Sequence, residues 1–295
     1  MMDTSTDIIV TAKAGISAKR KARGAVLRGL MYFSAALTTI LLVAIIGYIF
    51  YRGIPHVTWN LLSTVPSFLD DNIGILPNIL NTVYIIVIAL VFSLPIGVGT
   101  AVYLNEYASN KKLVRVIELA TETLSGIPSI IYGLAGMLIF VQALNIGTSI
   151  LAGALTLAVM TLPIIIRTTQ EALKTVPDSY REGALALGSG KWHMVRTVVL
   201  PCAMDGIVTG IILSIGRIVG ESAALLYTAG LANVILNPLQ SIKPGNAGAT
   251  LTVSLYIYAK ERGEFGVAFA IAVILLLITF TINIAAKLLA HKLKR

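Results

Sequence analysis

The chain has 295 residues, of which 56% are hydrophobic and only 13% are charged, and its formal net charge is +9. A soluble domain carries roughly 25% charged residues, so this composition excludes an ordinary soluble protein. Apolar runs of about 18 residues or more indicate a membrane protein instead. The expected fold class is all-α, a polytopic membrane protein built from transmembrane helices.

Apolar runs predict six transmembrane helices in chain order. The first follows a basic tail, residues 1–28, and has about 23 residues, which is too long for the apolar part of a signal peptide. No small-residue cleavage site follows it, so we expect a retained membrane anchor. The third and fourth runs are short. The six spans are placed at 29–51, 79–104, 127–144, 149–167, 204–229 and 265–290.

Lysine and arginine predict the orientation of these spans. Most of the 23 cationic residues fall in the basic tail, in the short loop after the second span, in the loop 168–203 and near the C-terminus, 291–295. Because cationic loops stay in the cytoplasm, both termini are expected there, with the loop 52–78 outside. Acidic lipid head groups account for the positive charge, so nucleic acid is not expected as a partner.

The loop 168–203 contains the sequence GSGK at 188–191, which raises the question of a phosphate-binding loop for ATP. That motif requires a glycine five positions before the second glycine of this stretch, and serine or threonine after the lysine. The chain has Leu185 and Trp192 at these positions, and no strand-like run precedes them. The nucleotide-binding interpretation is therefore rejected.

The first half of this loop is patterned for a short helix. The sequence SYRE, Ser179 to Glu182, fits a capping box. In that motif the serine caps the backbone amide of the glutamate and the glutamate reaches back. A helix is expected at about 180–187.

The second half predicts an elbow and a further helix. Gly188 stands where a helix takes its left-handed cap, a conformation that glycine enters at little cost. Ser189 can cap a second helix that runs to Leu200, and Pro201 marks the next boundary. The loop is expected to hold two short helices that lie along the membrane.

This hairpin resembles the EAA loop of ABC importer permeases. It follows the family pattern except at Gly183, where alanine is commoner, and at Val198, where isoleucine is usual. In that family the loop forms a coupling helix that fits into a cleft of the cytoplasmic ATPase. The residues that the resemblance assigns to coupling are Glu182, Gly183, Ala184, Gly188, Leu200 and Pro201.

The resemblance implies the type I ABC importer permease fold in a bacterial cell membrane, with the permease core at 79–290. Two other interpretations of the loop stay open. It can be a generic amphipathic hairpin at the membrane interface. Glu182 can also serve only to cap its own helix.

Two charged residues, Arg217 and Glu221, stand within the fifth predicted span. An arginine at the centre of such a helix costs about 2.5–3.5 kcal/mol on insertion scales, which makes it a functional candidate. The i,i+4 spacing places both residues on one helix face, in a stripe of small and hydroxyl side chains that includes Ser214. Such a stripe lines either a tight helix contact or a water-filled path.

Glycine pairs in the same span favour the helix-contact interpretation. Gly206/Gly210 and Gly216/Gly220 are both GxxxG pairs, which are typical of close helix packing in membranes. Packing explains the glycines but not an arginine. Glu221 can be merely the counter-ion of the arginine.

Three stretches resemble one branch of the family, the PstA-type phosphate importer permeases: SGIPSIIYGL (125–134), LPIIIRTTQEALKTVPDSYREGALALG (162–188) and GRIVGESAALLYTAG (216–230). The resemblance places Arg217 in the phosphate path and makes Arg167 a second candidate. A lipid-facing anchor is the alternative for Arg167. The candidate pathway residues are Arg217, Glu221, Arg167 and Ser214.

Charge limits what this chain does alone. Phosphate near pH 7 carries about −1.5, whereas Arg217 and Glu221 together sum to zero. Further positive charge is needed, from Arg167, from helix N-termini or from a second subunit.

The resemblance favours a second, related permease subunit. It also implies two ATPase subunits that hydrolyse ATP and an extracytoplasmic phosphate-binding protein. The chain itself is then a transport subunit and not an enzyme, and neither a cofactor nor a metal site is expected. The alternatives are a permease for phosphonate, sulfate or molybdate, and a proton-coupled secondary transporter.

Overall fold

A computed structural model describes residues 18–66 and 73–293 of the chain. Most of the predicted basic tail, six residues of the predicted outer loop (67–72) and the last two residues lie outside this description. Throughout the described ranges the regular structure is helical, with no strand. The predicted all-α fold class is confirmed.

The chain divides into two compact units, Met1–Tyr51 and Arg52–Arg295. The first contains almost all of α2 (Ala18–Gly53), a single apolar helix of 36 residues. About 20 apolar residues suffice to cross a bilayer, so α2 is long enough to span one. The predicted first span, 29–51, lies entirely within it.

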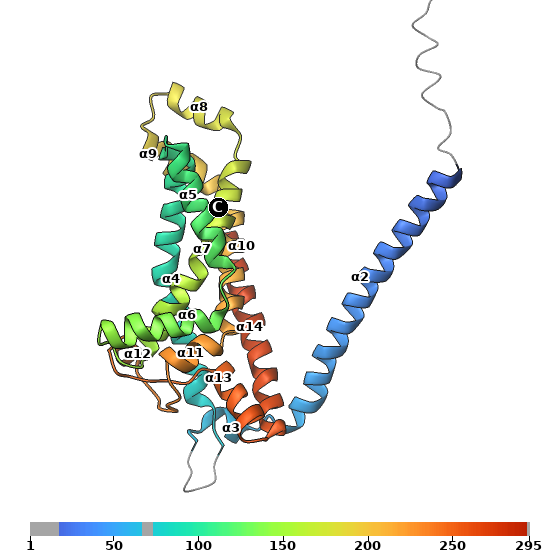
Figure 1. Ribbon diagram of the computed structural model, residues 1–295, viewed down its shortest axis with the longest axis vertical. Coiled ribbons are helices and arrows are strands. Elements are labelled where there is room, and N and C mark those ends of the chain that lie inside the picture. Colours follow the sequence, from blue (N-terminus) through green and yellow to red (C-terminus); the bar gives the residue numbers. More distant parts are fainter. Residues whose placement is uncertain (1–17, 67–72, 294–295) are drawn as a thin grey trace, which may run out of the picture. The chain divides into compact units, whose positions relative to one another are not determined.

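The second unit contains all the other described helices (Figure 1). Four of its segments, η3 to η6, are π-helical turns that continue a neighbouring α-helix, and η2 is a 3₁₀ turn. In chain order the elements are η2 (Ile54–His56), α3 (Trp59–Ser63), α4 (Leu76–Val102), η3 (Tyr103–Tyr107), α5 (Lys111–Ser125), α6 (Ser129–Gly136), η4 (Met137–Ala143), α7 (Ile150–Thr175), α8 (Asp178–Ala186), α9 (Lys191–Met194), η5 (Val195–Val199), α10 (Leu200–Val219), α11 (Ala223–Thr228), α12 (Pro238–Ser241), α13 (Leu251–Tyr256), η6 (Ile257–Glu261) and α14 (Phe265–Leu293).

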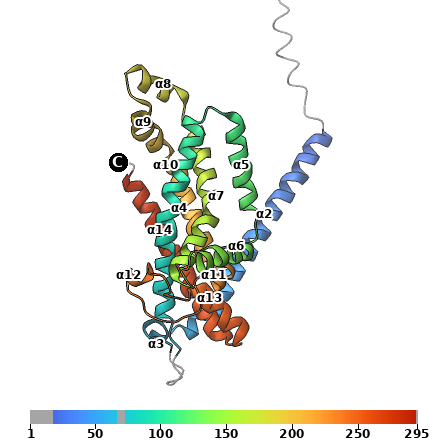
Figure 2. The ribbon, with the colours of Figure 1, turned by 60° about the vertical axis from the view of Figure 1, so that its left-hand side comes forward.

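Long helices run lengthwise through this unit. Figures 1 and 2 show α4, α7, α10 and α14 side by side, with α8 and α9 at one end of the bundle and α3, α12 and α13 at the other. The second, fourth and sixth predicted spans are confirmed as apolar helices: Leu76–Tyr107, Ile150–Thr175 and Phe265–Leu288.

The third predicted span is not one straight helix. The segment 127–144 contains α6 and η4, which are bent by 102° relative to α5. Figure 2 shows α5 running alongside α7 while α6 lies across the bundle. Among the described residues, five helices are long and apolar enough to cross a membrane, and six if this bent pair counts as one span.

The fifth span differs from the predicted 204–229 at both ends. It begins at Lys191, runs through η5 into α10 and stops at Val219, and α11 follows as a separate helix. Hydropathy measures the apolar stretch and not the helix, so the polar start at Lys191 was assigned to the loop. The break after Val219 falls at Gly220, Glu221 and Ser222, a short polar interruption between apolar runs, and averaging hydropathy over a longer window does not detect it.

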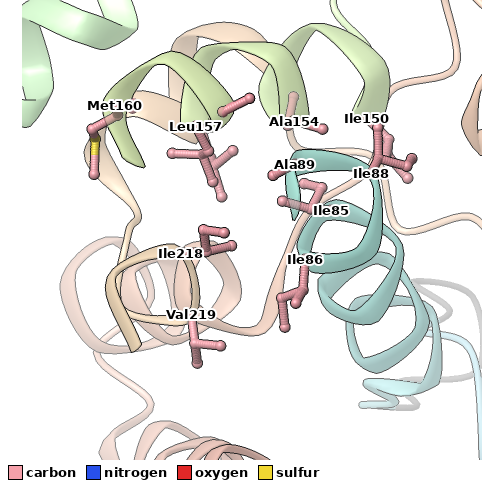
Figure 3. Close-up of a cluster of buried hydrophobic side chains, with 14 of the residues drawn as sticks. Ile85, Ile86, Ile88, Ala89, Ile150, Ala154, Leu157, Met160, Ile218 and Val219 are labelled. Atoms are coloured by element: carbon pink, nitrogen blue, oxygen red, sulfur yellow. The ribbon is translucent and has the colours of Figure 1, made fainter. Parts of the chain in front are cut away.

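The main hydrophobic core joins α4, α7 and α10. Figure 3 shows Ile85, Ile86 and Ala89 of α4 facing Leu157 of α7 and Ile218 of α10. These side chains are at most 4% exposed. This core places the last turns of α10 against the centre of the bundle.

Glycines bring α10 close to α7. A methyl group on Gly206 would collide with Ala172, and one on Gly210 would collide with the Thr168 side chain. The packing role predicted for this pair is confirmed. A methyl group on Gly216 would meet nothing within 4 Å, so the second glycine pair does not serve the contact with α7.

Prolines interrupt the hydrogen bonding of α4 and α7. Pro95 lies inside α4 and Pro163 inside α7. A methyl group on Gly97, two residues after Pro95, would lie 2.6 Å from the Ile165 side chain, two residues after Pro163. The two prolines therefore lie at the same level of this helix pair.

Amide side chains fix the opposite end of the bundle. The Asn78 amide donates to the Asn233 side chain at 2.8 Å and to the Ala249 carbonyl at 3.1 Å. Asn81 donates to the same carbonyl at 3.2 Å, and the Leu251 amide donates to the Thr82 hydroxyl at 3.0 Å. These bonds hold the segment before α13 against the start of α4.

The glycine contact generates a first prediction. Gly206→Leu should destabilise the detergent-solubilised chain by about 1–3 kcal/mol, because overpacking forces α10 away from α7. Gly216→Leu is the matched control, since its side chain enters open space in the isolated chain. Thermal unfolding followed by circular dichroism measures both. Equal losses of stability in the two variants would contradict the assigned contact.

Candidate coupling and translocation sites

The elbow between α8 and α9 has the backbone that its sequence predicts. Gly188 has φ of +81°, in the left-handed region. The Gly188 amide donates to the Leu185 carbonyl at 2.9 Å, and the Ser189 amide donates to the Ala184 carbonyl at 3.1 Å. This pair of bonds is a Schellman cap. The predicted left-handed termination at Gly188 is confirmed.

The predicted capping residues of the hairpin are wrong. Helix α8 begins at Asp178 after Pro177, so Ser179 lies inside the first turn and caps nothing. Gly190, and not Ser189, precedes α9. Proline already fixes a φ suited to a helix start, which explains the earlier beginning of α8.

The second hairpin helix also continues further than expected. No break occurs at Leu200 or Pro201, because η5 leads directly into α10 and Pro201 occupies its first turn. The π-helical turn η5 ends two residues before Pro201, so the proline lies where the regular i→i−4 hydrogen-bond pattern is already interrupted. The helix therefore crosses the predicted boundary.

The hairpin presents polar and apolar side chains to its surroundings. Glu182 and Gly183 are exposed and Ala184 is half-buried. Within the described residues the Glu182 side chain makes no hydrogen bond. Large apolar side chains lie exposed nearby, with Leu187 91% and Trp192 61% accessible. Exposed apolar groups of this size are typical of a surface that another protein covers.

Arg181 was not predicted as a site residue, yet it is the most extensively bonded side chain of the hairpin. Its guanidinium contacts the carboxylate of Glu106 in η3, with Nη2 to Oε1 at 2.9 Å. The Arg181 side chain is 15% exposed and that of Glu106 is 5% exposed. A carboxylate at the end of an apolar span was the available signal, but nothing in the sequence indicates its partner.

Arg217 lies in the last turn of α10 and is exposed in this chain. In the part of the chain that the structure describes, its guanidinium forms no hydrogen bond and no ion pair. Its neighbours Ile215 and Ile218 belong to the same buried hydrophobic cluster as Tyr132 of α6. The Tyr132 hydroxyl donates to the Leu124 carbonyl at 2.8 Å, so Arg217 lies beside the elbow between α5 and α6.

Glu221 points elsewhere. It is 7% exposed, and its Oε1 accepts a hydrogen bond from the Ala224 amide at 3.1 Å. Glu221 thus caps the start of α11. The expected Arg217–Glu221 pair is absent among the described ion pairs, because the helix that would align them ends at Val219.

The predicted stripe is accordingly divided between two helices. Gly206, Gly210, Ser214 and Arg217 belong to α10, whereas the positions after Gly220 do not continue its face. Ser214 is fully buried and its hydroxyl has no hydrogen-bond partner among the described residues.

Arg167 lies in a separate polar pocket. Its Nε donates to Glu171 Oε1 at 3.0 Å, and both side chains are mostly exposed. The pocket between α5 and α7 has a volume of about 280 Å³. Its lining residues are Glu118, Thr121, Glu122, Ser125, Pro163, Arg167, Gln170, Glu171 and Lys174. Three carboxylates and two cations therefore surround this space.

The end of α5 connects the two arginines. Ser125 lines the pocket that contains Arg167. The neighbouring Leu124 carbonyl holds Tyr132, whose ring belongs to the same buried cluster as Ile215 and Ile218 beside Arg217. The candidate pathway residues thus flank one elbow of the bundle, and Glu221 stands apart from them as a helix cap.

A bundle of apolar helices with broken segments inside and a capped helical hairpin at one end defines a multi-pass membrane permease. The chain belongs to the family of binding-protein-dependent transport system inner membrane components, whose sequence profile matches residues 93–295. The predicted resemblance to ABC importer permeases is confirmed.

Similar proteins agree with this assignment. A probable ABC transporter permease protein of Bacillus subtilis (strain 168), YqgI, is 36% identical over 280 residues, covering 91% of this chain and 95% of that protein. The phosphate transport system permease protein PstA of Haemophilus influenzae is 30% identical over 271 residues, covering 91% and 94% of the two chains. The likeness to the PstA type is thereby supported.

A solved structure shows the same fold. A bacterial ABC transporter involved in the import of the acidic polysaccharide alginate has a chain that superimposes with a TM-score of 0.64 at 13% identity. The superposition covers 93% of this chain and all of that chain.

The different surroundings of Arg217 and Glu221 generate a second prediction. Glu221→Ala should lower the stability of the solubilised chain by about 1 kcal/mol, because the Ala224 amide loses its cap. Glu221→Gln keeps an acceptor oxygen and should cost less. Arg217→Gln should change stability by less than about 0.5 kcal/mol, since no partner is lost.

Thermal unfolding in detergent compares the three variants. The assignment of Glu221 as a cap fails if Glu221→Gln and Glu221→Ala lose stability equally. A large loss in Arg217→Gln would show that the arginine has a partner within the chain.

Proposed function

We propose that this chain is the membrane permease subunit of an ATP-driven importer of inorganic phosphate. The observation that carries the proposal is Arg217, a cation in a membrane helix whose guanidinium makes no hydrogen bond and no ion pair within the described chain. Burying an unpaired charge in a membrane is costly, so a guanidinium without a partner is suited to meet an anion. The similarity to phosphate permeases supports phosphate as that anion.

The route for the anion follows the α5–α6 elbow. The helix turn that carries Arg217 shares a buried cluster with Tyr132 at this elbow, and the pocket with Arg167 is lined by Ser125 at the end of α5. Ser214, one turn before Arg217, contributes a buried hydroxyl without a partner. Glu221 contributes indirectly, by holding the break after α10 that exposes the arginine.

The two arginines are unequal in this proposal. Arg167 is already paired with Glu171, and its pocket contains one more carboxylate than cation. Such a pocket repels phosphate at close range. Arg217 therefore makes the principal contact, and the remaining positive charge comes from a second, related permease subunit.

The hairpin couples the chain to ATP hydrolysis. Glu182, Gly183 and Ala184 lie on α8, and apolar side chains of the hairpin are exposed around them. An ATPase subunit that covers this surface would bury Leu187 and Trp192. The assembly comprises two permeases, two ATPases and an extracytoplasmic phosphate-binding protein, with the hairpin and both termini in the cytoplasm.

Uptake measurements test Arg217, and this is the third prediction. Arg217→Gln should reduce phosphate uptake by phosphate-starved cells at least about tenfold, equivalent to roughly 1.4 kcal/mol. The double variant Arg217→Gln with Glu221→Gln should stay defective, because Glu221 caps α11 and does not neutralise the arginine. Arg217→Lys is the matched control and should retain part of the uptake.

All variants should accumulate in the membrane with their ATPase. Near-normal uptake by the double variant would remove Arg217 from the pathway. Uptake of labelled sulfate, molybdate or a phosphonate that excess unlabelled phosphate does not reduce would instead assign another oxyanion.

The fourth prediction concerns the elbow. Gly188→Val forces a β-branched residue to φ of +81°, which costs about 1–3 kcal/mol of local strain. The variant should insert normally but retain less ATPase and lose uptake. Gly190→Val is the matched control, because Gly190 has φ of −70° and open space around it.

Co-purification of the ATPase with each variant and uptake by intact cells measure the effect. Wild-type ATPase yield together with normal uptake in Gly188→Val would refute docking through this elbow.

A further inference from the structure

Arg181 connects three helical segments at the hairpin end of the bundle. Nε and Nη2 donate to the Glu106 carboxylate of η3, and Nη2 also donates to the Leu173 carbonyl at 2.9 Å. Nη1 donates to the Val176 carbonyl at 2.7 Å and to Asp178 Oδ1 at 3.1 Å. All five N–H groups that a guanidinium possesses therefore have acceptors.

These acceptors belong to different parts of the molecule. The Leu173 carbonyl is in the last turn of α7 and Val176 follows it, Asp178 starts α8, and Glu106 ends the helix that begins with α4. A cation at the C-terminus of α7 also interacts favourably with the dipole of that helix. One side chain thus links the hairpin to two long helices.

The carboxylate of Glu106 is held in place by a neighbouring side chain as well as by Arg181. Glu106 lies in the π-helical turn η3, where its neighbour Asn105 donates an amide hydrogen to Oε1 at 2.7 Å. π-helical turns are rare and occur frequently at functional sites. The turn directs the carboxylate of Glu106 toward α8 and away from solvent, since its side chain is 5% exposed.

A second contact joins the same turn to the other arm of the hairpin. The Lys191 ammonium, at the start of α9, lies 5.0 Å from the centre of the Tyr107 ring. This geometry is a cation–π interaction. Consecutive residues of η3, Glu106 and Tyr107, therefore contact α8 and α9 respectively.

From this geometry we infer that η3 is a clamp that transmits the movement of the hairpin to α4 and α7, with Arg181 and Glu106 as its positioning residues. The inference rests on the proposed coupling of the hairpin to an ATPase. A hairpin attached only by its connecting residues could tilt when the ATPase moves without moving the bundle. With both arms fixed to η3 and to the end of α7, a displacement of the hairpin displaces those helix ends.

Two other ion pairs among the described residues are exposed, unlike the buried pair of Arg181 and Glu106. Arg167–Glu171 lies on one helix and is largely exposed, and Lys174–Glu118 is 3.8 Å long with both side chains at least 42% exposed. Exposed pairs of this kind contribute little rigidity.

The test uses the assembly purified through a tag on this chain and reconstituted in vesicles. Phosphate taken up per ATP hydrolysed is measured for Glu106→Gln, Arg181→Lys and Tyr107→Leu. Each should lower this ratio by about fivefold with unchanged ATPase content, because coupling and not docking is lost. Arg181→Lys keeps the charge but supplies only three donors. Arg115→Gln is the matched control, since Arg115 is an exposed cation of α5.

A ratio within about twofold of wild type in both Glu106→Gln and Tyr107→Leu would overturn the clamp, and so would an equal loss in Arg115→Gln. If Glu106→Gln does not accumulate, Tyr107→Leu decides, because Tyr107 is 38% exposed and its loss leaves no buried charge.

Hydrogen exchange separates this inference from the proposed function. Glu106→Gln should raise amide exchange in α8 by about fivefold and leave α14 unchanged. A wild-type assembly that takes up no phosphate would refute the proposed function. The amide exchange measured in α8 would then still test the clamp by itself. Unchanged exchange in α8 would overturn the clamp whatever the substrate.

Discussion

Backbone polar groups in the interior of a membrane have no water to bond, and this constraint governs the second unit of the chain. Several places where a helix stops inside the bundle are closed by a side chain. The Thr252 hydroxyl donates to the Val219 carbonyl at 2.8 Å, and Glu221 accepts from the Ala224 amide in the first turn of α11. The Tyr132 hydroxyl closes the end of α5 in the same manner. Some polar residues that the sequence suggests for a substrate path are thus needed to bond the backbone groups that the helix breaks leave free.

The membrane also explains which helix positions the sequence could predict and which helix ends it could not. Apolar length predicted the positions of α2, α4, α7 and α14, because the bilayer sets that length. It did not predict the extension of α7 to Thr175 or the start of the fifth span at Lys191, since a helix continues beyond the apolar layer. Periodicity assumed an unbroken helix through Glu221, so the inferred ion pair with Arg217 was wrong.

Backbone features that depend on one residue could be predicted from the sequence, whereas contacts between distant residues could not. The left-handed backbone at Gly188 depends on the residue itself and was predicted correctly. The Arg181–Glu106 pair joins residues 75 positions apart, and many other carboxylates matched the arginine equally well in sequence. Removing one partner of a buried pair costs about 3–5 kcal/mol, because the other charge remains desolvated. The hairpin end of the bundle therefore depends on a contact that no motif records.

The prolines of α4 and α7 have a mechanical consequence. Each removes one i→i−4 hydrogen bond from its helix, so bending stiffness is lowest there. Since Pro95 and Pro163 lie at the same level, both helices bend most easily at one common cross-section of the bundle. Above it, the helix ends are joined to the hairpin through Arg181; below it, Asn78 and Asn81 tie α4 to the opposite loops. We therefore expect a force applied at the hairpin to bend α4 and α7 at these prolines rather than elsewhere along the two helices.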